Sequence, residues 1–173
     1  MTISRRQLVS GALATPFMSL LPRIARAAEP SFFAAPIVLD RNRVWTGVSV
    51  EGLPPAPFII DTGMVESAIS AEWAEEMKLR ERGASYIGGV GGLERSGVLK
   101  VEEVVIGGVF RIPYMEFHGM KALDDRNFKG LIGVGLMTEM ASDLDFVKGQ
   151  WRIYPGGRPD HAGLHAIPDS YLP

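Results

Sequence analysis

One stretch decides how this chain is expected to fold: FIIDTG, residues 58–63. Three apolar residues that favour β-structure lead directly to an acid, and a glycine then ends the run. Burying a lone carboxylate is costly unless a partner compensates, so Asp61 requires an explanation. One explanation is a strand end at which Asp61 and Thr62 hydrogen-bond to their own turn. The other is catalysis, which this short motif does not establish by itself.

The composition is that of one globular domain. The chain has 173 residues, of which 46% are hydrophobic and 22% charged, which suits a single domain with a real core. No residue is cysteine, so disulfides and thiolate metal sites are excluded. The formal net charge is −2 and no basic run occurs, so the sequence gives no indication of nucleic-acid binding.

Residues 1–27 have the pattern of a cleavable export signal. Arg5 and Arg6 precede a short, mildly apolar run over residues 8–21, and small residues occupy positions −3 and −1 of a cleavage site after Ala27. The arginine pair resembles a twin-arginine signal. A membrane anchor is the alternative, but the run is shorter than the ~20 residues that a spanning helix needs. We therefore expect a periplasmic or secreted protein without a stable membrane anchor.

Short strands separated by turns are predicted for the rest of the chain. Alternating residues over Val44–Val50 predict a strand, and Gly107-Gly108 predicts a tight hairpin. Ser70 predicts the N-cap of a helix over residues 71–79, with Trp73 in the core. Further strands are expected at 36–39, 58–60, 67–69, 98–106, 109–117, 143–147 and 150–154, with a second short helix at 136–141. These elements predict an all-β domain, a small closed or partly open β-barrel with one or two short helices.

A second distinctive stretch is SYIGGVGGL, residues 85–93, in which four of five consecutive positions are glycine. Such a run has too few side chains to build a core, so it predicts a flexible hairpin. A phosphate-binding loop is the other alternative, but the spacing does not match GxGxxG and no helix follows. A third stretch, LIG at residues 131–133, again ends an apolar run in glycine.

Taken in this order, the three stretches resemble the retropepsin-like aspartic proteases, the retroviral-type relatives of half a pepsin, over roughly residues 36–155. The resemblance implies that the catalytic loop consists of Asp61, Thr62 and Gly63. It implies a substrate-binding flap made of Ile87, Gly88, Gly89, Val90, Gly91 and Gly92. It also implies that the pocket is lined or supported by Leu131, Ile132 and Gly133. The expected organisation is a signal at 1–27, a protease domain at 28–155 and a Pro/Gly-rich tail at 156–173.

Two positions depart from the pattern of that family. Met64 follows the Asp-Thr-Gly motif where the family commonly has alanine, so we expect a narrower site or altered packing. Gly135 stands where the family often has aspartate or asparagine. We therefore expect the second helix to lose a side-chain hydrogen bond at its start.

The chain contains a single Asp-Thr-Gly motif, whereas peptide hydrolysis of this type uses two carboxylates that share a proton across one water molecule. The resemblance therefore implies a homodimer in which two copies of Asp61 meet at a two-fold axis. It implies an aspartic endopeptidase that acts on polypeptides and uses no metal or other cofactor. A non-catalytic peptide-binding module on the same fold is the main alternative, and an unrelated small β-barrel is another.

Other polar residues are expected to lie outside the active site. His161 and His165 have the i, i+4 spacing of metal ligands, but they occur in the Pro/Gly-rich tail without an evident third ligand. A solvated tail is therefore the favoured interpretation. Asp124, Asp125 and Asp143 are expected to be surface acids.

Overall fold

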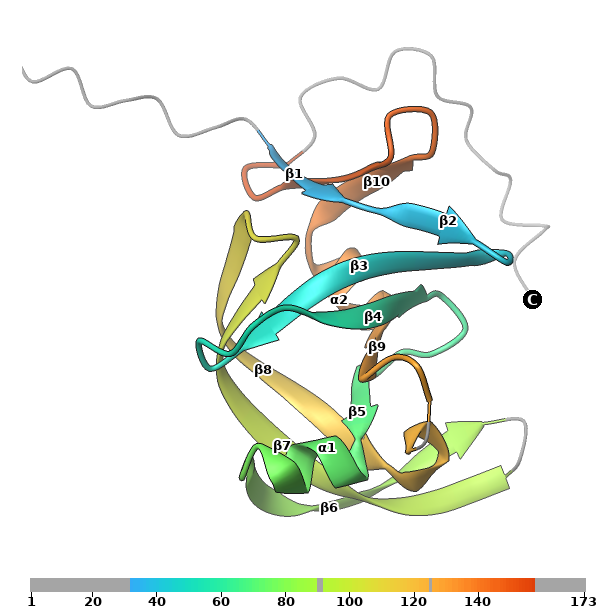
Figure 1. The fold of residues 1–173 in the computed structure, drawn as a ribbon, viewed down its shortest axis with the longest axis vertical. Helices are drawn as coiled ribbons and strands as arrows, with labels where there is room; N and C mark the ends of the chain where they lie inside the picture. Colours follow the sequence, from blue (N-terminus) through green and yellow to red (C-terminus); the bar gives the residue numbers. More distant parts are fainter. Residues whose placement is uncertain (1–31, 90–91, 125, 158–173) are drawn as a thin grey trace, which may run out of the picture.

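The structure is a computed structural model that describes residues 32–89, 92–124 and 126–157. Within these residues β-strands predominate over two short α-helices and one 3₁₀ turn (Figure 1). In chain order the elements are β1 (Phe33–Pro36), β2 (Val38–Asp40), β3 (Arg43–Val50), β4 (Ala56–Asp61), β5 (Ala68–Ser70), α1 (Ala71–Glu76), β6 (Arg80–Gly89), β7 (Gly92–Ile106), β8 (Phe110–Met120), η1 (Lys121–Leu123), β9 (Gly130–Gly133), α2 (Val134–Glu139), β10 (Ala141–Asp145) and β11 (Gln150–Tyr154).

The strands form two sheets. The larger sheet has the order β2-β3-β4-β9-β5-β8-β7-β6, and β3 also pairs with β7 through Val48–Ile106 to Val50–Val104. This extra pairing curls the sheet back on itself, as the long curved β7 and β8 show in Figure 1. The smaller sheet has the order β1-β11-β10. The predicted all-β, partly open barrel with short helices is confirmed.

The strand β9 is inserted between two strands that are close in sequence, β4 and β5. It runs parallel to β4, with Asp61 opposite Gly133, and antiparallel to β5. The stretches 58–63 and 131–133 are far apart in the chain, and this insertion makes them hydrogen-bonded neighbours (Figure 1). The two apolar runs that end in glycine therefore end at the same edge of the sheet.

Aromatic side chains of the core pack around Phe58 and support β4. The Phe58 ring is fully buried and meets Trp73 and Phe117 edge to face, each with ring centroids 6.2 Å apart. Such pairs stabilise by about 0.5–1.5 kcal/mol beyond the burial of their area. Trp73 is a core residue, as predicted, and the predicted alternation along β3 is confirmed by the burial of Val48 and Val50.

Several boundaries differ from the predicted ones for local reasons. The strand expected at 36–39 is divided, because β1 pairs with β11 whereas β2 pairs with β3, and the chain changes sheet at Ile37. The helix expected over 71–79 ends at Glu76, and Lys78 takes a left-handed conformation with φ of 55°. The second helix starts two residues before the expected one, directly after Gly133. The hairpin at Gly107-Gly108 is confirmed, with positive φ at both glycines.

Asp143 has ordered partners, so the expectation of a simple surface acid is wrong. Its carboxylate accepts hydrogen bonds from Arg152 Nε at 2.7 Å and from Tyr154 Oη at 3.0 Å. The hydrogen bond to Asp143 raises the pKa of Arg152, which also forms an ion pair with Asp145 at 3.4 Å. These contacts tie β10 to β11. Asp125 lies outside the described residues.

Asp124 also differs from that expectation, because it caps the N-terminus of α1. Ser70 Oγ accepts a hydrogen bond from Trp73 N–H at 3.1 Å, which confirms the predicted N-cap. The Ser70 hydroxyl donates to Asp124 Oδ1 at 2.7 Å, and Glu72 N–H donates to the same oxygen at 3.0 Å. Burial by itself raises the pKa of Asp124, but these hydrogen bonds outweigh it and hold the pKa below the ordinary value of 3.8.

We expect Asp124→Ala to lower the free energy of unfolding by about 1 kcal/mol, the usual cost of a lost cap. Because folding lowers the pKa of Asp124, its charge stabilises the fold fully above pH 3.8 and ceases to do so as the pH falls through the lower folded value. Urea unfolding between pH 7 and pH 3 measures the effect, and the wild-type advantage should shrink towards pH 3. Asp40→Asn, at an exposed acid of β2, is the control and should unfold like the wild type. An advantage that is independent of pH would contradict the role of the charge.

Candidate active site

The Asp61 carboxylate lies at the end of β4, directly after the buried residues 58–60. The backbone N–H of Gly63 donates to Asp61 Oδ1 at 2.9 Å. The local turn considered as an alternative to catalysis is therefore present, but it engages one carboxylate oxygen. Among the described residues, no hydrogen bond reaches Asp61 Oδ2. Asp61 is half-buried, whereas Thr62 and Gly63 are exposed. The carboxylate is thus oriented by its own turn and keeps one oxygen for another group.

Gly133 fixes the loop that follows Asp61. Its N–H donates to the buried Ser67 Oγ at 3.0 Å. A β-carbon built on Gly133 would lie 2.3 Å from the carbonyl oxygen of Glu66 and 2.5 Å from that of Val65. Only glycine allows β9 to approach the backbone of this loop so closely. The residue implied to support the site therefore does so through its missing side chain.

The start of α2 is held by the same loop, which explains Gly135. Val134 N–H donates to the carbonyl of Met64 at 2.7 Å, and Gly135 N–H donates to that of Val65 at 2.9 Å. The helix has no side-chain N-cap bond, as expected from the missing aspartate or asparagine. Backbone carbonyls of residues 64–65 take its place. A β-carbon on Gly135 would lie 2.7 Å from the Val65 oxygen, so a side chain does not fit here without movement.

We expect Gly135→Asn to destabilise the protein by about 1–3 kcal/mol, the usual cost of overpacking. The reason is that its β-carbon meets the Val65 carbonyl, which already accepts the hydrogen bond from residue 135. Thermal unfolding followed by circular dichroism measures the change. Gly156→Ala is the matched control, since a β-carbon there meets nothing within 4 Å. A stabilised Gly135→Asn variant would mean that the usual family residue restores a missing interaction.

Met64 packs inward and does not narrow the pocket beside Asp61. It is half-buried against a cluster that includes Ile59, Phe128 and Leu131. It does not line the pocket described next. The expected narrowing of the site by Met64 is therefore not found, and the expected change in packing stays a prediction.

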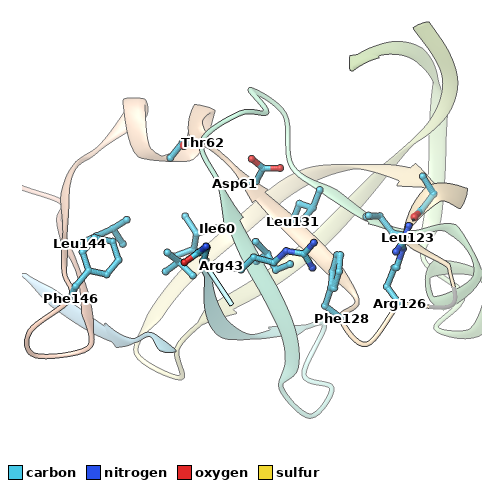
Figure 2. Close-up of a pocket in the computed structure, with 14 residues that line it drawn as sticks. Arg43, Ile60, Asp61, Thr62, Leu123, Arg126, Phe128, Leu131, Leu144 and Phe146 are labelled. Carbon is cyan, nitrogen blue, oxygen red and sulfur yellow. Dashed lines mark hydrogen bonds between the residues drawn. The ribbon is translucent and has the colours of Figure 1, made fainter. Parts of the chain in front are cut away.

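A pocket of about 660 Å³ opens beside Asp61 (Figure 2). Among the described residues that line it, Asp61 is the only acid. Ile132 is fully buried and does not line the pocket, whereas Leu131 does. The lining residues are Asn42, Arg43, Val44, Ile59, Ile60, Asp61, Thr62, Ala122, Leu123, Arg126, Phe128, Leu131, Leu144 and Phe146.

The glycine-rich stretch forms the end of a long hairpin. β6 and β7 pair in register up to Gly89 opposite Gly92, so the predicted hairpin is confirmed and is more regular than expected. Val90 and Gly91 lie outside the described residues. Ile87 is buried, whereas Tyr86 and Leu93 are 69% and 78% exposed. None of the described residues of 87–92 lines the pocket beside Asp61.

Sequence reasoning missed the cationic and aromatic part of the pocket. Arg43, Arg126 and Phe128 line it, and they come from β3 and from the loop before β9. The position of Arg43 could have been found by extending the pairing of β3 and β4 by one residue. The position of the other two depends on how the 124–129 loop folds back, for which the sequence offers no pattern.

Comparison with known families decides the assignment of the chain. The sequence model of a family described as "Aspartyl protease" matches residues 46–136, which is more than half of the chain. The chain belongs to the aspartyl protease family. This confirms the resemblance at the level of the family, and the matched segment contains Asp61 and Gly133.

Comparisons with individual proteins add little to that assignment. No curated protein matches the chain. A similar solved structure is that of a retropepsin-like aspartic protease from Rickettsia conorii, with 19% identity and a TM-score of 0.46. The match covers 70% of this aspartyl protease chain and 87% of the other.

The described residues show neither a membrane-spanning helix nor a cluster of metal-binding side chains. In the part of the chain that the structure describes, no helix has the length and apolar character needed to cross a membrane. Over the same residues, no group of three or more histidine, aspartate or glutamate side chains is placed to hold a metal ion. His161 and His165 lie outside the described residues.

Proposed function

We propose that this member of the aspartyl protease family is an endopeptidase whose active site is completed by a second copy of the chain. The observation that carries the proposal is the half-buried Asp61, whose Oδ1 is held by Gly63 and whose carboxylate borders a pocket of about 660 Å³. The chain contains one Asp-Thr-Gly motif, so the second acid has to come from another molecule. A two-fold axis supplies the same residue again.

The chemistry follows from two carboxylates placed a few ångströms apart. Such a pair shares one proton, because both carboxylates cannot ionise at that separation. The ionised member removes a proton from a water molecule, whose oxygen attacks the peptide carbonyl carbon. The protonated member donates to the carbonyl oxygen. The tetrahedral intermediate then expels the amine, which takes the proton that the first carboxylate removed from water, while the second carboxylate recovers its proton from a hydroxyl of the intermediate as the carbonyl re-forms.

The exposed residues of the active-site loop are available for contact with the second copy. Thr62 and Gly63 are exposed, and Val65 next to them is a large apolar side chain that is 64% exposed. In the proposed dimer, Thr62 holds the two loops in register. The β6–β7 hairpin, including Gly88 and Gly89, closes over the bound polypeptide and excludes water.

A non-catalytic binding module would be favoured if Met64 or Gly135 disturbed the catalytic loop. Neither residue lines the pocket beside Asp61, since Met64 packs inward and Gly135 fits against the carbonyl of Val65. They therefore no longer favour that alternative. We further propose that residues 1–27 direct export to the periplasm or the cell exterior.

The proposal is tested by combining sedimentation with a cleavage assay. Dimers should form as the concentration of the purified chain rises, and specific activity on a peptide mixture at mildly acidic pH should rise in parallel. An activity per chain that stays constant while the protein is a strict monomer would contradict the shared site. Cleavage by an Asp61→Asn chain at the wild-type rate would remove Asp61 from the mechanism.

A further inference from the structure

Two arginines line the pocket beside Asp61, and neither has an ion-pair partner among the described residues. Arg43 and Arg126 both lie within the lining, where Asp61 is the only acid among the residues that the structure describes. The ion pairs found elsewhere in the described residues involve Arg41, Arg111 and Arg152. Arg126 uses its Nε to donate to the carbonyl of Ala122 at 3.4 Å, which leaves its terminal nitrogens available. The pocket therefore carries two cations in a protein whose net charge is negative.

The strand register places Arg43 close to Asp61. The last pair between β3 and β4 is Val44 opposite Ile60, so the next position sets Arg43 opposite Asp61. The backbone of Arg43 is also held by the strand on its other side, β2, in which Asp40 lies opposite Arg43. The two residues between them, Arg41 and Asn42, have φ of 48° and 60°, as a tight hairpin turn requires. Even so, Arg43 and Asp61 do not form an ion pair within 4.0 Å.

Apart from Asn42 and Thr62, the remaining residues that line the pocket are apolar. Leu123, Phe128 and Leu131 are buried members of one cluster, and Phe128 packs edge to face on Trp45 with centroids 5.8 Å apart. In the view of Figure 2, Phe128 lies between Arg43 and Arg126. Both arginines are exposed, so their attraction to a carboxylate exceeds its value in open water only where a bound peptide excludes water from the pocket and lowers the local dielectric. Its planar fork also matches both oxygens of a carboxylate.

We infer that Arg43 and Arg126 make the site selective for polypeptides that carry an aspartate or glutamate near the cleaved bond. The acidic side chain cannot lie directly at Asp61, because two carboxylates repel there unless one is protonated. It therefore lies roughly one to three residues away, given a rise of about 3.3 Å per residue in an extended peptide. Apolar side chains on the other positions fit the wall formed by Leu123, Phe128 and Leu131. This inference rests on the proposed function for the identity of the bound polymer.

The test compares acidic and neutral peptides on the full chain. Two positional-scanning sets of octapeptides are used, which are identical except that one carries glutamate and the other glutamine at the scanned position. The wild type should cleave the glutamate set with a kcat/KM about tenfold higher or more at one position, as expected for a hydrogen bond between charged groups. In Arg43→Gln/Arg126→Gln the ratio between the sets should fall towards one. Arg41→Gln, at a neighbouring arginine outside the pocket, is the matched control and should keep the wild-type ratio.

A binding measurement separates this inference from the proposed catalysis. Fluorescence anisotropy with the labelled peptide sets is measured on Asp61→Asn, with and without the two arginine substitutions. One possible result is that no form cleaves any peptide, while Asp61→Asn binds the glutamate set more tightly than the glutamine set. If Asp61→Asn/Arg43→Gln/Arg126→Gln then binds both sets equally, the proposed proteolysis is contradicted and the inferred selectivity for acidic peptides is supported. Equal binding and equal cleavage of the two sets would overturn the inference. It is also overturned if the arginine variant sediments as a monomer where the wild type is a dimer, since the arginines then contact the second copy.

Discussion

An Asp61→Asn chain is expected to lose about 10³-fold or more of its peptidase activity, in the range of contributions made by acid–base groups. Asparagine keeps the shape of the side chain and can accept the Gly63 N–H through its own Oδ1, so the turn after β4 should survive. What it loses is the ability to take a proton from water. The Tm of the variant should therefore be close to that of the wild type, whereas its peptide cleavage should be almost completely lost. A matching loss of stability would indicate that the substitution acts on folding.

Mixing the two forms distinguishes a shared site from an independent one. If each chain works alone, an equal mixture of wild type and Asp61→Asn retains one half of the activity of the wild type at the same total concentration. If each dimer needs two ionisable residues, random assortment leaves only about one quarter of the dimers active. The chains are mixed below the dissociation constant and then concentrated, so that they exchange. A retained activity of one half would rule out the symmetric site.

Gly133→Ala is expected to be the most destabilising single substitution in the site, by about 3 kcal/mol or more, beyond the usual range for overpacking. Its β-carbon would meet three backbone atoms of residues 65 and 66 at 2.3–2.6 Å, and backbone cannot move aside as the end of a side chain can. To relieve these close contacts, β9 has to separate from the active-site loop. This would break the hydrogen bond from Gly133 to Ser67 and the pairing with Asp61.

Urea unfolding and the cleavage assay together measure this effect. Gly83→Ala is the matched control, because a β-carbon in that strand position of β6 meets nothing within 4 Å. Gly133→Ala should unfold at a much lower urea concentration than the wild type. It should also cleave peptides more slowly under conditions in which it is folded. A Gly133→Ala protein as stable and active as the control would mean that the loop does not depend on this close approach.

The elements that follow local rules could be predicted from the sequence. The run before Asp61, the N-cap at Ser70 and the hairpin at Gly107-Gly108 each depend on neighbouring residues, and each was correctly predicted. The apolar run at 131–133 was also found, because glycine at the end of such a run is unusual. Its pairing with β4 was not predicted, because nothing in its composition specifies the partner strand.

The features that escaped prediction depend on long-range contacts. Asp124 caps a helix whose first residues precede it by about fifty positions, and nothing in its local sequence distinguishes it from a solvated acid. From the sequence, Gly135 indicates only the loss of a hydrogen bond. The structure shows that the carbonyl of Val65 occupies the space that a side chain at residue 135 would need. Arg43 becomes part of the pocket only through the register of β3 on β4.

The insertion of β9 between β4 and β5 has a consequence for the order of folding. Residues 58–61 and 68–70 are synthesised early, yet the space between them is filled by residues 130–133. The chain must therefore close a loop of about seventy residues before the Asp61 turn gains its support, and contacts so distant in sequence form slowly. A nascent chain that has not yet released residue 133 lacks an assembled site. The proposed proteolytic site can therefore assemble only after residue 133 has left the ribosome.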